Sequence, residues 1–199
     1  MANYFSERDK NITNRLRALR DQLPECCEEF FVGIEPQTTT LTRLNYAYDL
    51  RIFFDYLLKN VRAFRDYKDV YDFTAEDLNK ITLGNLEAYM EYLSYYSFDG
   101  KEKTNAEKGK ARKISTVRTF FKYMYNHDRI NQNVSAKLTM PKNHDKDIIR
   151  LEKKEVERIL DAAETGAGMS EHQRKVQRNT HARDFAIVSL LLGTGIRVS

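Results

Sequence analysis

The end of the chain places an arginine behind a glycine turn, an arrangement suited to binding a phosphate. Gly193 and Gly195 flank one threonine, and Arg197 follows two residues later. Glycine tolerates the positive φ that ends a helix, so this turn can hold the arginine on a fixed base. A guanidinium keeps its charge and offers paired donors that match two phosphate oxygens. From these residues alone, the expected role of Arg197 is to cap the turn or to pair with a carboxylate; whether it has a catalytic role depends on its context in the chain.

A basic helix is expected over residues 110–126. Its apolar residues, Phe120 and Phe121 among them, recur at helical spacing, and cations and hydroxyls occupy the opposite side. Lysine and arginine supply charge to a phosphate, and serine or threonine supplies directional hydrogen bonds. The candidate DNA-contacting residues are cations and hydroxyls on this helix, with two cations outside it: Arg43, Lys110, Arg112, Lys113, Ser115, Arg118, Thr119, Lys122 and Lys142.

Two other interpretations apply to a single basic amphipathic helix. Its cationic side can simply be solvated, or the helix can lie on a membrane surface. Binding to a membrane surface is disfavoured because the apolar side of the helix is aromatic and β-branched, as in a protein core. The pattern of this helix does not exclude the interpretation that its cationic side is simply solvated.

The distribution of charge points to a polyanionic partner more strongly than the net charge of +4 does. Residues 101–150 hold thirteen Lys or Arg against five Asp or Glu, a balance of +8. The segments before and after this window are close to neutral or acidic. A cationic window of this size is typical of a surface that binds nucleic acid.

Several classes of protein are disfavoured by the composition. The apolar stretch 185–192 is far shorter than the roughly 20 residues that span a bilayer. The charged N-terminal residues form no secretory signal, so we expect a cytoplasmic protein. Cys26 and Cys27 are adjacent, which suits neither a disulfide nor a metal site, and the four histidines show no ligand spacing. We expect no metal, no cofactor and no membrane partner.

The elements that must position these residues are predicted to be helical throughout, which makes the fold class all-α. The apolar segment 185–192 is expected to form a helix that is buried on most faces. Residues 101–109 are expected to form an exposed loop, and the polar segment 165–181 either contacts DNA or is disordered. Further helices are expected over residues 5–23, 25–32, 38–60, 84–96, 110–126 and 151–163.

Three motifs resemble the tyrosine recombinases, the phage-integrase family. The run from Arg183 through Thr194-Gly-Ile-Arg-Val-Ser is similar to that family's first catalytic box. Ser115-x-x-Arg118-x-Phe-Phe resembles its DNA-facing helix. Residues 131–135 resemble its Asn-Pro turn, with Val134 where proline usually stands.

The resemblance implies a domain order. Residues 1–36 would be an N-terminal helical extension, and residues 37–142 a SAM-like, core-binding helical bundle that binds DNA. Residues 143–150 would be a linker, and residues 151–199 the first helices of a catalytic domain that is incomplete here.

The resemblance also implies an activity and partners. Tyrosine recombinases cut and rejoin double-stranded DNA without metal, through a 3′-phosphotyrosyl intermediate, in a homo-oligomer that is tetrameric in the synapse. Arg197 would be the first of two arginines that bind the scissile phosphate. The remaining catalytic groups, including the nucleophile, are expected beyond residue 199, so this stretch should bind DNA without recombining it. A stand-alone helical DNA-binding module is the alternative.

Overall fold

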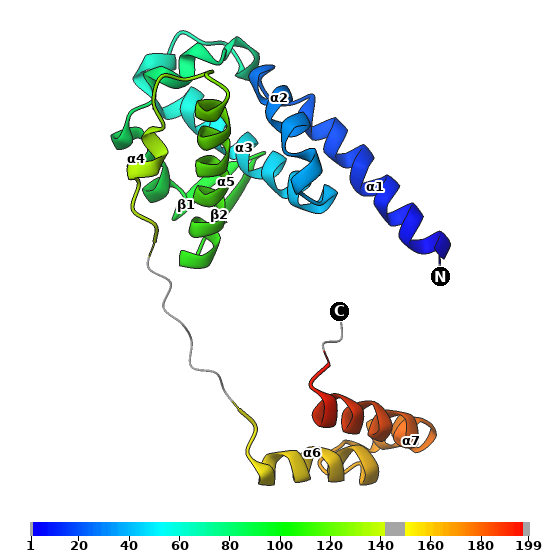
Figure 1. Ribbon diagram of the computed structural model, residues 1–199. Coiled ribbons are helices and arrows are strands. Elements are labelled where there is room, and N and C mark those ends of the chain that lie inside the picture. Colours follow the sequence, from blue (N-terminus) through cyan, green and yellow to red (C-terminus); the bar gives the residue numbers. More distant parts are fainter. Residues whose placement is uncertain (1, 142–149, 197–199) are drawn as a thin grey trace. The chain divides into compact units, whose positions relative to one another are not determined.

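The computed structural model describes residues 2–141 and 150–196, and the side chains from residue 7 onward. The chain divides into two compact units, Met1–His144 and Asp145–Ser199 (Figure 1). The division falls inside the segment predicted to be a linker. Arg197 and Lys142 lie outside the described residues.

The all-α fold class is confirmed, with one small hairpin added to it. Short 3-10 turns, η1 to η5, join the longer elements: η1 Glu35–Gln37, η2 Arg62–Phe64, η3 Val70–Asp72, η4 Glu76–Lys80 and η5 Val134–Lys137. The α-helices and strands of unit 1 are α1 Ala2–Arg20, α2 Cys26–Gly33, α3 Thr40–Asn60, α4 Leu83–Tyr92, β1 Tyr95–Phe98, β2 Lys101–Thr104 and α5 Glu107–Asn126. Unit 2 contains α6 Lys153–Thr165 and α7 Glu171–Thr194.

The centre of unit 1 is the packing of α3 against α5 (Figure 1). Thr39 caps α3, because its side chain accepts a hydrogen bond from the Thr42 amide at 3.2 Å. Aromatic rings of the two helices pack edge to face, and the ring centroids of Phe53 and Phe121 are 6.2 Å apart. Their side chains are fully buried, so the apolar spacing seen in the sequence does form the core.

The two N-terminal helices complete this core. Leu16 and Leu19 of α1 are buried where α1 packs on α3. Phe30 of α2 lies edge to face with Phe120 of α5 at 5.3 Å. The N-terminal extension is thus packed on the remainder of unit 1 through its apolar residues, while α1 reaches outward (Figure 1).

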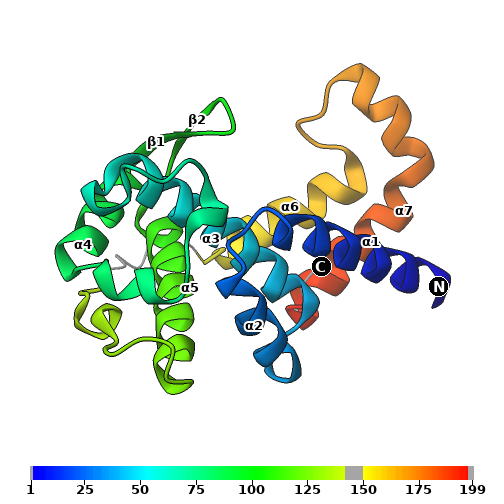
Figure 2. The ribbon, with the colours of Figure 1, turned by 90° about the horizontal axis from the view of Figure 1, so that it is seen from above.

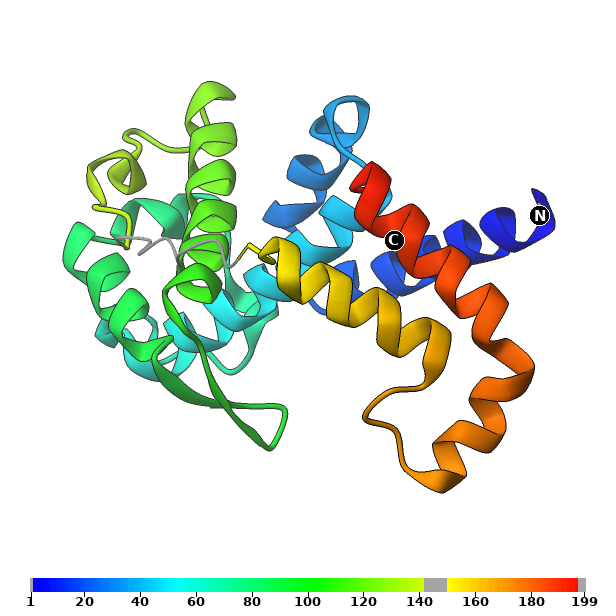
Figure 3. The same cartoon turned by 90° about the horizontal axis from the view of Figure 1, so that it is seen from below.

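The expectation of a loop over residues 101–109 was wrong, whereas the expected exposure of residues 101–104 is confirmed. Residues 95–104 form an antiparallel hairpin in which Tyr95 pairs with Thr104 and Phe98 with Lys101. Asp99 and Gly100 make the turn with φ values of 52° and 69°, as a tight hairpin requires. The hairpin projects from the helices as a separate finger (Figures 2 and 3).

Unit 2 differs from expectation in two ways. The polar segment 165–181 is mostly helical, since α7 is continuous from Glu171 to Thr194, so disorder of this segment is contradicted and its contact with DNA stays a prediction. The apolar stretch within α7 is not buried: Leu190 is 57% exposed and Ile187 49% exposed. Within the described part of unit 2, α7 has only α6 as a neighbour, and one helix cannot cover an apolar face that extends around most of another.

The glycine turn at the end of α7 forms as expected. Gly195 adopts a φ of 64° and its amide donates to the Leu191 carbonyl at 2.9 Å, which ends the helix. Gly193, in contrast, lies within the helix.

Candidate nucleic-acid interface

The exposed side of α5 carries the predicted polar residues in one row. Arg112, Ser115, Thr119 and Lys122 follow one another at spacings of three and four residues, so they share a face of the helix. The opposite face is anchored in the core by Phe120, which is fully buried. Packing of the apolar face therefore fixes which side of α5 meets solvent.

A groove lies against the C-terminal half of this face. Its volume is about 530 Å³, and we call it the α5 groove. Its lining comes from α5 and from the segment that follows it: Ser115, Arg118, Thr119, Lys122, Tyr125, Asn126, Asn133, Ser135, Ala136 and Met140. Four predicted DNA-contacting residues, two of them cations, are thereby brought to one hollow.

The two cations of the α5 groove have no acidic partner among the described residues. No carboxylate in residues 7–141 or 150–196 lies within ion-pair distance of Arg118 or Lys122. Thr119 donates to the Ser115 carbonyl at 2.9 Å, so its hydroxyl proton is already used within the helix. The groove consequently offers two uncompensated charges and the Ser115 hydroxyl to an anion.

Arg112 forms an ion pair with a buried carboxylate, although part of its own side chain is exposed. Its Nη1 and Nη2 donate to the two carboxylate oxygens of Asp49 at 2.6 and 2.8 Å, and Thr116 Oγ1 donates to the same carboxylate at 2.9 Å. Asp49 is fully buried on α3, and burial raises the pKa of its carboxyl group while Arg112 and Thr116 act to lower it. Half of the Arg112 side chain is still exposed.

Two other predicted contacts on α5 are held by neighbours in the fold. Lys110 pairs with Glu107 at 3.2 Å, and its side chain is mostly covered. Lys113 is buried and donates to Asn105 Oδ1 at 2.8 Å. Burial lowers the pKa of the Lys113 ammonium, and the nearby Asp49 carboxylate acts against that shift.

Arg43 was predicted to contact DNA, but its guanidinium is bound by other groups of the protein. Its residue is 8% exposed, and its Nη1 donates to the carbonyls of Glu35 at 2.8 Å and Thr38 at 3.3 Å. An ion pair with the Glu35 carboxylate at 3.2 Å completes the arrangement. The guanidinium therefore ties η1 to the start of α3, and we leave it out of the proposed interface.

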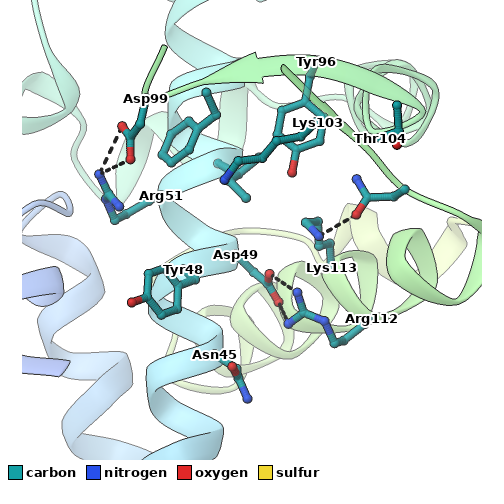
Figure 4. Close-up of a pocket in the computed structure, with 13 residues that line it drawn as sticks. Asn45, Tyr48, Asp49, Arg51, Tyr96, Asp99, Lys103, Thr104, Arg112 and Lys113 are labelled. Atoms are coloured by element: carbon teal, nitrogen blue, oxygen red, sulfur yellow. Dashed lines mark hydrogen bonds and ion pairs between the residues drawn. The ribbon is translucent and has the colours of Figure 1, made fainter. Parts of the chain in front are cut away.

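Sequence reasoning missed a second cationic hollow, between the hairpin, α3 and the first half of α5 (Figure 4). Arg51 and Lys103 line it and were not among the candidates. The Asp99–Gly100 pair is a two-residue hairpin-turn signal, and it could have located Lys103 on a strand.

Within the described residues, no group of three or more His, Cys, Asp or Glu side chains is placed to hold a metal ion. The helices of the same residues include none with the length and apolarity needed to cross a membrane.

Comparison with known proteins gives consistent matches. The chain is 28% identical over 160 residues to a tyrosine recombinase XerC of Caldanaerobacter subterraneus, covering 77% of this chain and 40% of that protein. It is 24% identical over 180 residues to the tyrosine recombinase XerC of two Leptospira interrogans serovars, copenhageni and Lai, covering 89% of this chain and 49% of each relative. The chain thus spans less than half the length of these relatives. No family model matches it, and no solved structure matches it.

Proposed function

We propose that this chain, which matches tyrosine recombinases XerC at 24–28% identity, binds duplex DNA through the α5 groove as part of a site-specific recombinase of that family. The observation that carries the proposal is the pair of uncompensated cations, Arg118 and Lys122, on one exposed helix face.

The physical argument concerns what such a groove attracts. Each phosphate of duplex DNA carries a charge and condensed counterions, and a cation that replaces those counterions gains free energy from their release. Among the described residues, Arg118 and Lys122 form no ion pair that would have to break before they bind a phosphate. Arg112, at the other end of the row, keeps half of its side chain exposed despite its bond to Asp49. The row therefore suits a phosphate backbone along much of α5.

The catalytic part of the proposal rests on Arg197. In the reaction of this family a tyrosine oxygen attacks the scissile phosphorus and displaces the 5′ oxygen, which takes up a proton. Rejoining reverses these steps on a new strand. Negative charge builds up on the nonbridging oxygens in each step, and a fixed guanidinium stabilises it. We assign this role to Arg197, two residues after the left-handed Gly195 that ends α7.

The nucleophile is not assigned to a residue of this chain. All twelve tyrosines lie in residues 1–144, the portion proposed to bind DNA. The proposal for the whole protein is accordingly a cytoplasmic enzyme that acts as a homo-tetramer on double-stranded DNA, with no metal or small-molecule cofactor. For the chain itself it is DNA binding without strand cleavage.

Salt dependence of DNA binding tests the α5 groove directly. Binding of a fluorescent duplex is measured by anisotropy over a range of salt concentrations, for the wild-type chain and for the double variant Arg118→Ala/Lys122→Ala. If each cation binds one phosphate, the slope of log affinity against log salt becomes shallower by about 1.8, since each contact contributes about 0.9.

The matched control removes the same charge elsewhere in unit 1. Arg62 and Arg65 are exposed and pair with no carboxylate of the described residues. Arg62→Ala/Arg65→Ala should leave the slope close to that of the wild type. Equal effects of the two double variants, or a wild-type affinity that does not change with salt, would contradict the proposal.

A further inference from the structure

The hollow on the hairpin side of α5 has the composition of an anion site. It has a volume of about 440 Å³ and is enclosed by β1–β2, α3 and the N-terminal half of α5; we call it the hairpin pocket (Figure 4). Four cations line it: Arg51, Lys103, Arg112 and Lys113. The aromatic and polar side chains among them, including Tyr48 and Tyr96, supply hydroxyl groups.

The two carboxylates of the hairpin pocket are each engaged by an arginine. Asp49 accepts both donors of Arg112, and Asp99 pairs with Arg51 at 3.3 Å (Figure 4). No carboxylate of the described residues pairs with Lys103 or Lys113. Two lysine charges are therefore left without a counterion at the pocket wall.

Lys113 gives the stronger reason to expect an anion. It is 7% exposed, and Asn105 is the one acceptor that its ammonium has among the described residues. An ammonium has three donors, so this buried group has fewer acceptors than donors among the described residues. The pKa of Lys113 is lowered chiefly by burial; the Asp49 carboxylate acts against that shift, and repulsion from Arg112 and Lys103 adds to it.

Lys103 is held in place without being neutralised. Its Nζ lies 5.4 Å from the centroid of the Phe98 ring, and the Arg51 guanidinium lies 5.1 Å from the same ring. A ring face attracts a cation but removes none of its net charge. The hairpin thus brings a cation to the pocket that stays available to an external anion.

We propose that the hairpin pocket binds a backbone phosphate of the same duplex that lies in the α5 groove, with Lys103 and Lys113 as its cations. Continuity along α5 favours this occupant over a free anion. Arg112 at the pocket wall and Lys122 in the groove share one helix face and are ten residues apart, about 15 Å along the axis. Duplex DNA carries a charge for about every 1.7 Å of its length, so one duplex supplies phosphates over the whole distance.

This proposal rests on the proposed function, and a single-residue variant tests it separately. Lys103→Gln removes one charge from an exposed strand residue and keeps a polar, unbranched side chain that is one atom shorter. One lost phosphate contact makes the salt slope shallower by about 0.9, which weakens binding about eightfold at about 0.1 M salt. The control, Lys101→Gln, removes the same charge two residues away on β2, from a residue that does not line the pocket. It should change the slope much less.

Competition with inorganic phosphate identifies the source of the anion. We expect millimolar phosphate to displace duplex no better than chloride at equal ionic strength, because the site is built along a continuous backbone. Saturable phosphate binding that Lys103→Gln abolishes, with an unchanged duplex slope, would assign the pocket to a small free anion and overturn the proposal.

The outcomes separate this proposal from the proposed function. If Arg118→Ala/Lys122→Ala flattens the slope while Lys103→Gln and Lys101→Gln behave alike, the hairpin pocket is not a DNA contact and the α5 groove stands. If the wild-type chain binds duplex without salt dependence, both proposals fail. A loss specific to Lys103→Gln supports the hairpin pocket.

Discussion

Replacing Arg112 should destabilise unit 1, even though Arg112 lies on the face proposed to bind DNA. Arg112→Met keeps much of the stem of the side chain and removes the guanidinium. Asp49, which is fully buried, then retains one side-chain hydrogen bond, from Thr116 at 2.9 Å. A carboxylate that accepted two hydrogen bonds from one guanidinium is left with one neutral donor, Thr116, and the charge of the nearby Lys113.

The expected loss in the free energy of unfolding follows from how deeply each member of the Asp49–Arg112 ion pair is buried. Removing one member of a fully buried ion pair costs about 3–5 kcal/mol, because the other charge stays buried and uncompensated. The Asp49 side chain is 1% exposed, but that of Arg112 is 50% exposed, so water can partly replace the guanidinium. We therefore expect a loss of about 2–3 kcal/mol in the free energy of unfolding at neutral pH.

The loss should depend on pH with a defined sign. Burial already raises the pKa of Asp49 above its ordinary value, and without Arg112 it rises further. A carboxyl group with a higher pKa in the folded than in the unfolded protein binds protons preferentially when folded, so stability falls as pH rises between the two pKa values. The deficit of Arg112→Met is thus largest at neutral pH and shrinks towards about pH 4, the pKa of an unfolded aspartate.

The unfolding of unit 1 can be measured separately from that of unit 2. The protein has no tryptophan, and all twelve tyrosines lie in residues 1–144, so the tyrosine band of the near-ultraviolet circular dichroism spectrum follows unit 1 alone during urea unfolding. Arg118→Met is the matched control on the same helix, with no ion pair among the described residues, and should stay within about 0.5 kcal/mol of the wild type.

A second variant isolates the pairing. Asp49→Asn/Arg112→Met removes the buried charge together with its partner and should be more stable than Arg112→Met at neutral pH. The reasoning is refuted if Arg112→Met unfolds like Arg118→Met, or if its deficit is the same at neutral pH and at about pH 4.

Two further predictions use the same unfolding assay. Gly33→Ala should lower the free energy of unfolding by about 1–3 kcal/mol, because the added Cβ would lie 2.5 Å from Cε2 of Tyr123. In the control, Gly84→Ala, the added Cβ meets no close atom, so this variant should be as stable as the wild type or more stable. Equal stabilities of the two variants would contradict this prediction. Burial alone would raise the pKa of Asp77, but hydrogen bonds from Lys80 and its neighbours hold it at about 2. Asp77→Asn should therefore cost about 1–2 kcal/mol at neutral pH, a difference that shrinks as pH falls from about 4 to 2; a deficit that persists at pH 2 would rule out this charge effect.

The sequence alone determined the helices of unit 1 and the orientation of the most important one. The spacing of Phe120 and Phe121 identified the buried side of α5, and the structure confirms it. The opposite side, with Ser115, Arg118 and Lys122, then had to face outward, because a helix that buries one face exposes the other. This inference needs no partner from elsewhere in the chain.

Tertiary structure decided which cations are available. Lys113 and Lys122 stand nine residues apart on one helix, yet one is buried and the other exposed. Arg112 meets a carboxylate 63 residues earlier in the chain, and Arg43 is taken up by backbone carbonyls. Charge density along the sequence measures how many cations a segment has, but not which of them a distant residue neutralises.

The hairpin and α7 show the same limit. Lys103 faces a pocket because strand pairing turns it towards α3 and α5, and the lysine-rich composition of its segment carried no such information. The apolar run of α7 predicted burial, and Leu190 is exposed, since burial requires a neighbouring element to cover it. Local pattern fixes the face that a helix would bury, whereas contacts between residues far apart in sequence fix what that face meets.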